Sequence, residues 1–211
     1  FFRMMFGLPK AEGIPTLPFL FSGIALWLFF STILAAIYPG VSANMGILRK
    51  MPVNPLIFAI SATGMPLLTI SIYLALLLCM SLYFGVAPSW TWLCLPFLVI
   101  LVGLFAMGLG LLVCALGIYK RDIIVLLPII LQLGMFVTPI FFPPDIVPAQ
   151  FRWAVSINPM AHAVTMFRDA LFLEHIPAAF PLGVTCGMTL LAWLVGYPLF
   201  RRTMRYAADT I

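Results

Sequence analysis

Residues 117–144 read GIYKRDIIVLLPIILQLGMFVTPIFFPP, and this stretch decides how the rest of the chain is interpreted. It opens with the charged triplet Lys120-Arg121-Asp122, and every later residue in it is uncharged. The uncharged run is long enough to cross a bilayer, because the hydrocarbon core takes about 20 helical residues. We therefore expect a membrane-spanning helix over residues 123–142, entered through a charged turn and left at a Pro-Pro pair.

The composition of the whole chain favours the same class of protein. Hydrophobic residues make up 64% of the 211 residues and charged residues 8%, against about 45–50% and about 25% in soluble domains. A soluble domain of this length could not cover so large an apolar surface. The formal charge of +5 comes from basic residues that are split among short turns. It therefore indicates membrane orientation rather than nucleic-acid binding.

Breaks in the apolar sequence divide the chain into further spans. Pro39-Gly40 ends one apolar run, and residues 85–89, which read GVAPS, interrupt a long uncharged stretch. The chain begins with Phe1 rather than Met, so we interpret its first residues as the tail of a span whose upstream part is missing. The sequence predicts an all-α integral membrane protein with six transmembrane helices, the first one truncated, in a single domain over residues 1–211. The expected spans are 1–6 (end of the first), 17–38, 57–84, 92–118, 123–142 and 181–200.

Alternation of these spans assigns each loop to one side of the membrane. One side carries an excess of basic residues in two turns and the C-terminal tail, namely Arg49, Lys50, Lys120, Arg121, Arg201, Arg202 and Arg205. The charges on the other side balance. By the positive-inside rule the basic side is cytoplasmic.

Residues 143–180 are too charged to cross a bilayer and too apolar to be a free loop. Asn158-Pro159, followed by apolar residues at helical spacing, predicts an N-cap, a proline at the first helical position and one apolar face. A shorter helix would precede it, beginning at Pro148. We expect two short helices on the outer face between the fifth and sixth spans. The alternative is an amphipathic loop that lies on lipid.

The expected spans contain essentially no ionisable residue beyond their ends, and no GxxxxGK[ST] motif occurs in the chain. Acid–base or metal chemistry needs several such groups that converge, and the four cysteines are far apart. We therefore expect no catalytic, cofactor or metal site. Ion-coupled transport usually needs an intramembrane carboxylate, so the energy for any transport would come from a cytoplasmic partner subunit.

Aromatic side chains gather in two of the expected spans. The residues are Trp27, Phe29 and Phe30 in one span and Phe136, Phe141 and Phe142 in another. Ring faces stack on the apolar C–H faces of sugars without strong hydrogen bonds, so such rings would let a glycan slide past. Core packing or contact with lipid is the alternative interpretation.

An ordered series of motifs runs through most of the chain, from about residue 17 to residue 171. It consists of Gly23, Trp27-Leu28-Phe29-Phe30-Ser31, Asn44 with Leu48-Arg49-Lys50, Tyr119-Lys120-Arg121-Asp122, Pro128, Gln132, Thr138-Pro139-Ile140, Asn158-Pro159-Met160 and Arg168. This series resembles the ABC-2 type permeases that export polysaccharides, such as the O-antigen, teichoic acid and capsule exporters. The order and spacing of the motifs carry the resemblance, since each motif alone is common.

The resemblance implies a homodimer with six spans per subunit, which carries an undecaprenyl-diphosphate-linked glycan across the plasma (cell inner) membrane, as in lipopolysaccharide biosynthesis. ATP and Mg would bind to a separate cytoplasmic ABC ATPase, present in two copies. The coupling loop to this ATPase would be residues 42–56. The residues implied in coupling are Asn44, Leu48, Arg49, Lys50, Lys120, Arg121 and Asp122.

The resemblance also implies an outer gate in residues 143–180, formed with Pro139, Asn158, Pro159, Met160 and Arg168. The aromatic glycan path would include Trp27, Phe29, Phe30, Phe141 and Phe142. One feature departs from the family: the coupling loop continues as Met51-Pro52-Val53-Asn54-Pro55 and lacks the acidic residue found in many members. Two alternatives stay open, an ABC-2 exporter of a drug or small lipid and a membrane-embedded glycan-processing enzyme. A structural membrane scaffold is a third.

Overall fold

Uncharged, apolar sequence forms long helices here, because a helix pairs its backbone groups internally and needs no water to do so. The computed structural model describes residues 15–51, 53–141, 150 and 152–209. Its elements are α2 (Thr16–Ser42), α3 (Met45–Lys50), α4 (Leu56–Ala62), α5 (Gly64–Tyr83), η1 (Trp90–Leu93), α6 (Cys94–Tyr119), α7 (Asp122–Val137), α8 (Arg152–Ile157), α9 (Pro159–Phe172) and α10 (Ala179–Asp209).

Four segments in the described part of the chain are long and apolar enough to span a membrane. They are Thr16–Ser42, Leu56–Tyr83, Trp90–Tyr119 and Ala179–Tyr206. The predicted all-helical membrane class is therefore confirmed. The expected first span, over residues 1–6, lies outside the described residues.

The helix α7 is shorter than the expected span over residues 123–142. It ends at Val137, and Thr138 has an extended backbone with ψ of 134°. The cause is Pro139, because a proline disfavours helical geometry in the residue before it and offers no N–H to continue the helix. A short non-helical segment therefore follows α7.

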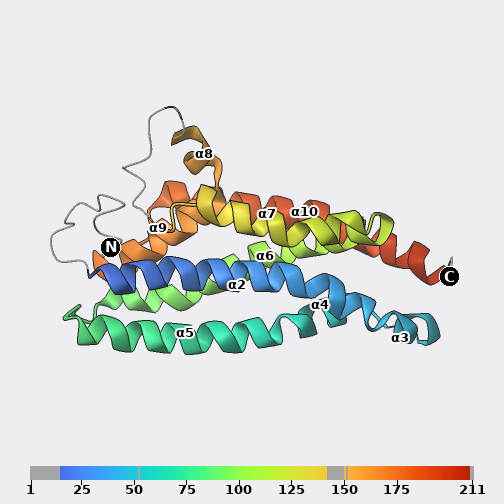
Figure 1. Cartoon of the computed structure of the whole chain (residues 1–211), viewed down its shortest axis with the longest axis horizontal. Coiled ribbons are helices and arrows are strands. Elements are labelled where there is room, and N and C mark those ends of the chain that lie inside the picture. The colour runs from blue at the N-terminus through green and yellow to red at the C-terminus, as the bar shows by residue number, and fades with distance from the viewer. Residues whose placement is uncertain (1–14, 52, 142–149, 151, 210–211) are drawn as a thin grey trace.

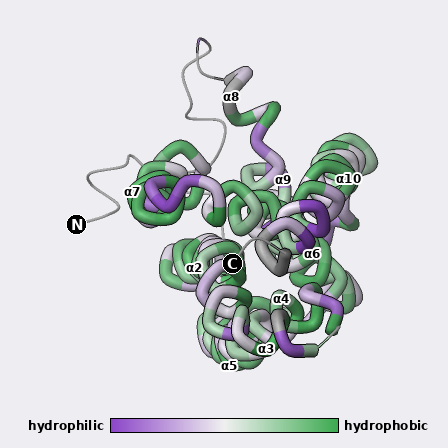
Figure 2. The backbone as a smooth tube through the Cα atoms, turned by 90° about the vertical axis from the view of Figure 1, so that its right-hand side faces the viewer, coloured by the Kyte–Doolittle hydropathy of each residue, from purple (hydrophilic) through white to green (hydrophobic). Residues whose placement is uncertain are grey.

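The helix α6 lies at the centre of the bundle, between α2 and α10 (Figures 1 and 2). It approaches α10 closely at two glycines, since a Cβ at Gly196 would collide with the carbonyl oxygen of Gly108. The indole Nε1 of Trp193 on α10 donates a hydrogen bond to the carbonyl of Leu104 on α6 at 2.8 Å. These contacts fix α10 against the central helix.

The chain turns back repeatedly between two ends of the bundle. Figure 1 shows α3, the α6–α7 turn and the C-terminal end of α10 at one end, which we call the basic end. At the opposite end lie the start of α2, the start of α6 and α9, and we call this the α9 end. In Figure 2, seen from the basic end, hydrophilic segments mark the start of α7 and the end of α10. The basic turns predicted to share one side thus lie together.

Candidate functional site

The helix α9 begins with the cap that the sequence predicts. Asn158 has an extended backbone, its side-chain oxygen accepts a hydrogen bond from the N–H of Met160 at 3.0 Å, and Pro159 occupies the first turn. The apolar face is buried, including Val164 and Phe167 at 1% and 3% exposure. The predicted N-cap is therefore confirmed, and α9 packs against α10, α6 and α2. The expected start of the preceding helix at Pro148 lies outside the described residues.

Arg168 on α9 holds three segments together at the α9 end. Its side chain is 5% exposed. Nη1 donates to the carbonyl of Pro139 at 3.0 Å, and Nη2 donates to the carbonyls of Ile140 and, at 3.2 Å, Phe19. The guanidinium also lies 3.7 Å from the centroid of the Phe19 ring. One side chain thus joins α9, the start of α2 and the segment that follows α7, and we call this group the arginine node.

The charge of Arg168 is compensated by carbonyl dipoles, since no ion pair involves it within the described residues. Burial lowers the pKa of Arg168 to about 9, and the negative charge of Asp169 opposes this shift. The guanidinium is therefore protonated at neutral pH. Burial raises the pKa of Asp169, while His175 and Arg168 act in the opposite direction. Buried cations are costly unless hydrogen-bonded, so the carbonyl cage is what allows Arg168 to be buried.

Gly23 on α2 provides the space that the arginine node requires. A Cβ at this position would lie 2.5 Å from Nη2 of Arg168 and 3.1 Å from Cγ2 of Ile140. Any larger residue would push the guanidinium away from its acceptors. This explains in physical terms why a glycine stands in the motif series at this position.

A second link joins the end of α7 to the start of α9. The side-chain amide of Asn158 donates to Oγ1 of Thr138 at 3.0 Å, and Thr138 donates to the carbonyl of Gly134 at 3.0 Å. The structure therefore brings Pro139, Asn158 and Arg168 into one region. The other two residues expected there, Pro159 and Met160, are buried in the first turn of α9.

Two contacts at this end were missed by the sequence reasoning. Oγ1 of Thr91 donates to the carbonyl of Ala170 at 2.5 Å, and the indole of Trp92 donates to the carbonyl of Leu171 at 3.1 Å. Both satisfy carbonyls in the last turn of α9, which has no further helical partners for them. Nothing in the sequence shows which carbonyl lies opposite a side chain 79 residues away.

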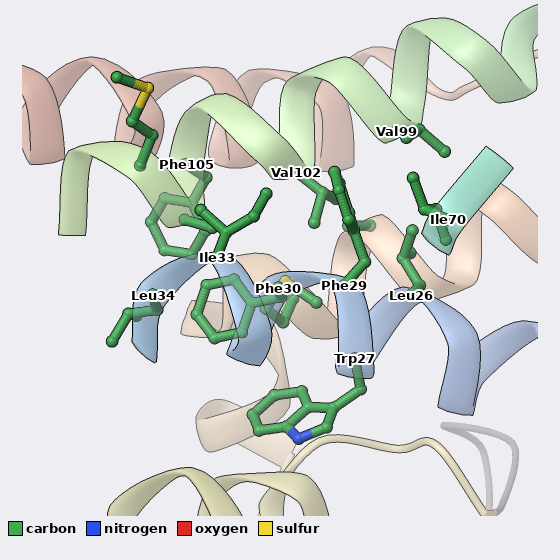
Figure 3. Packing of buried hydrophobic residues seen from close by; sticks show 14 of the residues in the cluster. Leu26, Trp27, Phe29, Phe30, Ile33, Leu34, Ile70, Val99, Val102 and Phe105 are labelled. Carbon is green, nitrogen blue, oxygen red and sulfur yellow. The ribbon is translucent and has the colours of Figure 1, made fainter. Parts of the chain in front are cut away.

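The aromatic residues expected to line a glycan path are core residues of the single chain. Trp27, Phe29 and Phe30 are 6%, 3% and 5% exposed. Phe30 stacks on Phe105 of α6 with centroids 5.6 Å apart, and Figure 3 shows Trp27 pointing away from α6. A Cβ at Gly134 of α7 would lie 3.0 Å from the Trp27 ring. These positions agree with the alternative of core packing.

Of the remaining two aromatic residues of that set, the structure describes Phe141, which follows the end of α7. Phe141 is half-buried and stacks on the exposed Phe136 with centroids 6.0 Å apart. Phe142 lies outside the described residues. A glycan path along these rings stays a prediction.

The residues expected to couple to an ATPase lie at the basic end. Asn44 precedes α3, and its amide donates to the carbonyl of Gly40 at 2.8 Å. Leu48 packs against the core and Lys50 is exposed, whereas the side chain of Arg49 lies outside the described residues. A role in coupling stays a prediction for all of them.

The α6–α7 turn supplies the other predicted coupling residues. Lys120, Arg121 and Asp122 are all exposed. Asp122 is the first residue of α7, where a carboxylate interacts favourably with the helix N-terminus. The turn therefore presents both signs of charge to the surface.

The comparison with protein families decides the class of this chain. The family described as ABC-2 type transporter matches residues 1–172. The chain belongs to this family. It is a membrane permease subunit, and an ABC transporter permease works with an ATPase partner. The resemblance read from the motif series is therefore confirmed.

Curated relatives are permeases of export systems. The chain is 24% identical to the O-antigen export system permease protein RfbA of Myxococcus xanthus over 212 residues, which cover 99% of this chain and 81% of the relative. It is 26% identical to the polysialic acid transport protein KpsM of Escherichia coli, over 87% of this chain and 71% of the relative. It is also 24% identical to an O-antigen export system permease protein RfbA of Klebsiella pneumoniae, over 75% of this chain and 61% of that relative.

Proposed function

We propose that this permease is the membrane subunit of an ATP-driven exporter that moves a lipid-linked polysaccharide across the plasma (inner) membrane. The observation that carries the proposal is the pair of matched relatives, whose names specify O-antigen export and polysialic acid transport. The cargo that both have in common is a long surface glycan. An undecaprenyl-diphosphate-linked glycan, such as O-antigen, is the substrate we propose.

The working assembly would be a homodimer with six spans per subunit and two copies of a cytoplasmic ABC ATPase. The basic end would face the cytoplasm, because basic residues accumulate on that side. The ATPase would contact α3 and the α6–α7 turn, through Asn44, Leu48, Arg49, Lys50, Lys120, Arg121 and Asp122. ATP and Mg would bind to the partner and not to this chain.

The α9 end would then be the outer gate. The support is that α7, whose first residues lie at the proposed ATPase side, ends directly beside the arginine node through Pro139 and Ile140. A shift of α7 along its axis would pull these two carbonyls away from Arg168. Pro139 and Ile140 follow the end of α7 and are not helical, so their carbonyls are held by Arg168 and a movement of α7 would act directly on the node.

The decisive experiment uses the full-length permease in its native host. We expect it to co-purify with an ABC ATPase, and we expect deletion of its gene to remove the surface glycan while lipid-linked glycan accumulates inside. An unchanged surface glycan, or turnover of lipid-linked substrate without ATP, would refute the proposal and favour the enzyme. A small lipid or drug as the transported cargo would favour the other ABC-2 exporter class.

A narrower test addresses the proposed gate. Replacing Pro139 with Ala allows the α7 backbone to continue, because the residue before it is no longer restricted. We expect slower export with normal assembly of the complex. Export at the wild-type rate would exclude Pro139 from gating and leave the cargo assignment untouched.

A further inference from the structure

The C-terminal end of α10 extends beyond what a bilayer core requires. The helix has 31 residues, about 46 Å at a rise of about 1.5 Å per residue, against a hydrocarbon core of about 30 Å. Residues 179–200 are uncharged, and Arg201 is the first charged residue. When the apolar part fills the core, the last turns of α10 lie at the level of the lipid headgroups.

The last turns of α10 have two different faces. Phe200, Thr203 and Met204 are 1%, 1% and 4% exposed and anchor the helix to the bundle. The opposite face carries two series of residues spaced by four, which places its side chains in two adjacent rows. We call it the arginine face, and its residues line an open surface hollow of about 620 Å³: Tyr197, Pro198, Arg201, Arg202, Arg205 and Tyr206.

The arginine face is positively charged and open to the surroundings. Arg201, Arg202 and Arg205 are exposed. The guanidinium of Arg202 lies 5.9 Å from the centroid of the Tyr206 ring. Guanidinium groups donate paired hydrogen bonds that match the geometry of phosphate oxygens. Tyrosines are enriched at the headgroup level of membranes.

We propose that the arginine face binds the phosphate headgroup of an anionic membrane lipid. Two observations specify this occupant. Three exposed guanidinium groups line one open surface hollow, and their positive charge complements a negatively charged phosphodiester. They also begin where the uncharged part of the helix ends, which is where a lipid presents its phosphate. The burial of the opposite face holds the helix that carries the three groups against the bundle.

The test uses delipidated full-length permease in a neutral detergent, titrated with phosphatidylglycerol and followed by native mass spectrometry. Phosphatidylcholine, which is zwitterionic, serves as the comparison lipid. Each basic residue near a membrane surface strengthens binding of anionic lipid about fivefold. We therefore expect the triple variant R201Q/R202Q/R205Q to bind phosphatidylglycerol about 100-fold more weakly. Binding of phosphatidylcholine should stay weak and unchanged.

Two control variants separate a built site from general charge. R201K/R202K/R205K keeps the charge but loses the paired geometry, and we expect intermediate affinity. K120Q/R121Q removes two positive charges from the α6–α7 turn at the same end, and we expect it to bind phosphatidylglycerol as the wild type does. All substituted side chains are exposed, so gel filtration should show unchanged folding.

Three results would overturn the assignment. The triple glutamine variant would bind phosphatidylglycerol as tightly as the wild type, or K120Q/R121Q would weaken binding equally. In the third case, inorganic pyrophosphate at the same concentration would displace the lipid from the wild type, which would indicate a site for a free anion. The experiment reads lipid binding without transport, so its failure would leave the proposed export function standing.

Discussion

Arginines at the two ends of the bundle are held in opposite ways. Arg168 is 5% exposed and donates to three carbonyls from two other segments. Arg201, Arg202 and Arg205 are exposed on one helix face. The first arginine has its partners within the chain, so its removal should damage the fold. The other three have open surroundings, so their removal should change what the chain binds and leave the fold intact.

The largest loss of stability is expected when the buried Arg168 is replaced. Arg168→Met keeps the length of the side chain but leaves the carbonyls of Pro139 and Ile140 without the guanidinium donor, whereas the carbonyl of Phe19 keeps its bond from Oγ of Ser22. Each unsatisfied buried polar group costs about 1–3 kcal/mol, so we expect the two carbonyls together to cost about 2–6 kcal/mol and to lower the melting temperature in detergent. Arg168→Lys should be intermediate, because an ammonium group cannot span the same acceptors. A wild-type melting temperature for Arg168→Met would show that the node does not stabilise the permease.

The next largest loss of stability is expected when the space that Gly23 leaves for the arginine node is filled. Gly23→Ala places a Cβ within 2.5 Å of Nη2 of Arg168, and overpacking of this kind costs about 1–3 kcal/mol. The matched control is Gly183→Ala in α10, where a Cβ meets nothing within 4 Å. We expect the control to be neutral or stabilised by about 0.5–1 kcal/mol. Equal melting temperatures for the two variants would contradict the packing described for Gly23.

A smaller effect distinguishes the two roles of Asn158. Asn158→Ala removes the N-cap of α9 and the link to Thr138, and we expect a loss of about 1–2 kcal/mol. Thr138→Val removes the link and keeps the cap, so it should cost less. Hydrogen exchange in the first turn of α9 separates them: it should accelerate in Asn158→Ala and stay near the wild-type rate in Thr138→Val. Equal acceleration in both variants would show that the cap is not the main contribution.

The titration of Asp169 in α9 should make the stability of the permease depend weakly on pH, and the sign of this dependence follows from the direction of the pKa shift. Burial raises the pKa of Asp169 above its ordinary value of 3.8, so the folded state binds the proton more tightly than the unfolded state. Stability should therefore fall as the pH rises from about 3.8 through the raised pKa, and then stay level. Asp169→Asn should remove this slope in melting curves measured between acidic and neutral pH. A slope that persists in Asp169→Asn would assign it to another group.

The smallest effect on stability is expected at the basic end. Exposed substitutions usually change stability by less than about 0.5 kcal/mol, so the double charge reversal Arg121→Glu with Asp122→Arg should melt close to the wild type. We expect its association with the ATPase partner, measured by co-purification, to fall sharply. Normal association and export would remove the α6–α7 turn from the coupling mechanism. A large drop in melting temperature would break the comparison between the two ends.

Local signals in the sequence were strong enough to predict several features of this chain. Long uncharged runs predicted the helical membrane class because a bilayer admits few other structures. Asn158-Pro159 predicted the cap of α9 because that contact lies within three residues of chain. The order of the motifs indicated the ABC-2 family, which the family comparison confirmed.

Only the tertiary structure decided which residues meet across the bundle. The sequence marked Gly23, Pro139 and Arg168 separately, but Arg168 and Phe19 are 149 residues apart. It marked Trp27, Phe29 and Phe30 as rings for a path, which stays a prediction, but it did not show that these rings are buried against α6 and α7 within the single chain. Helical periodicity states which side chains share a face, and it carries no information on what that face will contact. These contacts are set when the helices pack, and this packing buries Arg168 and leaves the arginines of α10 exposed.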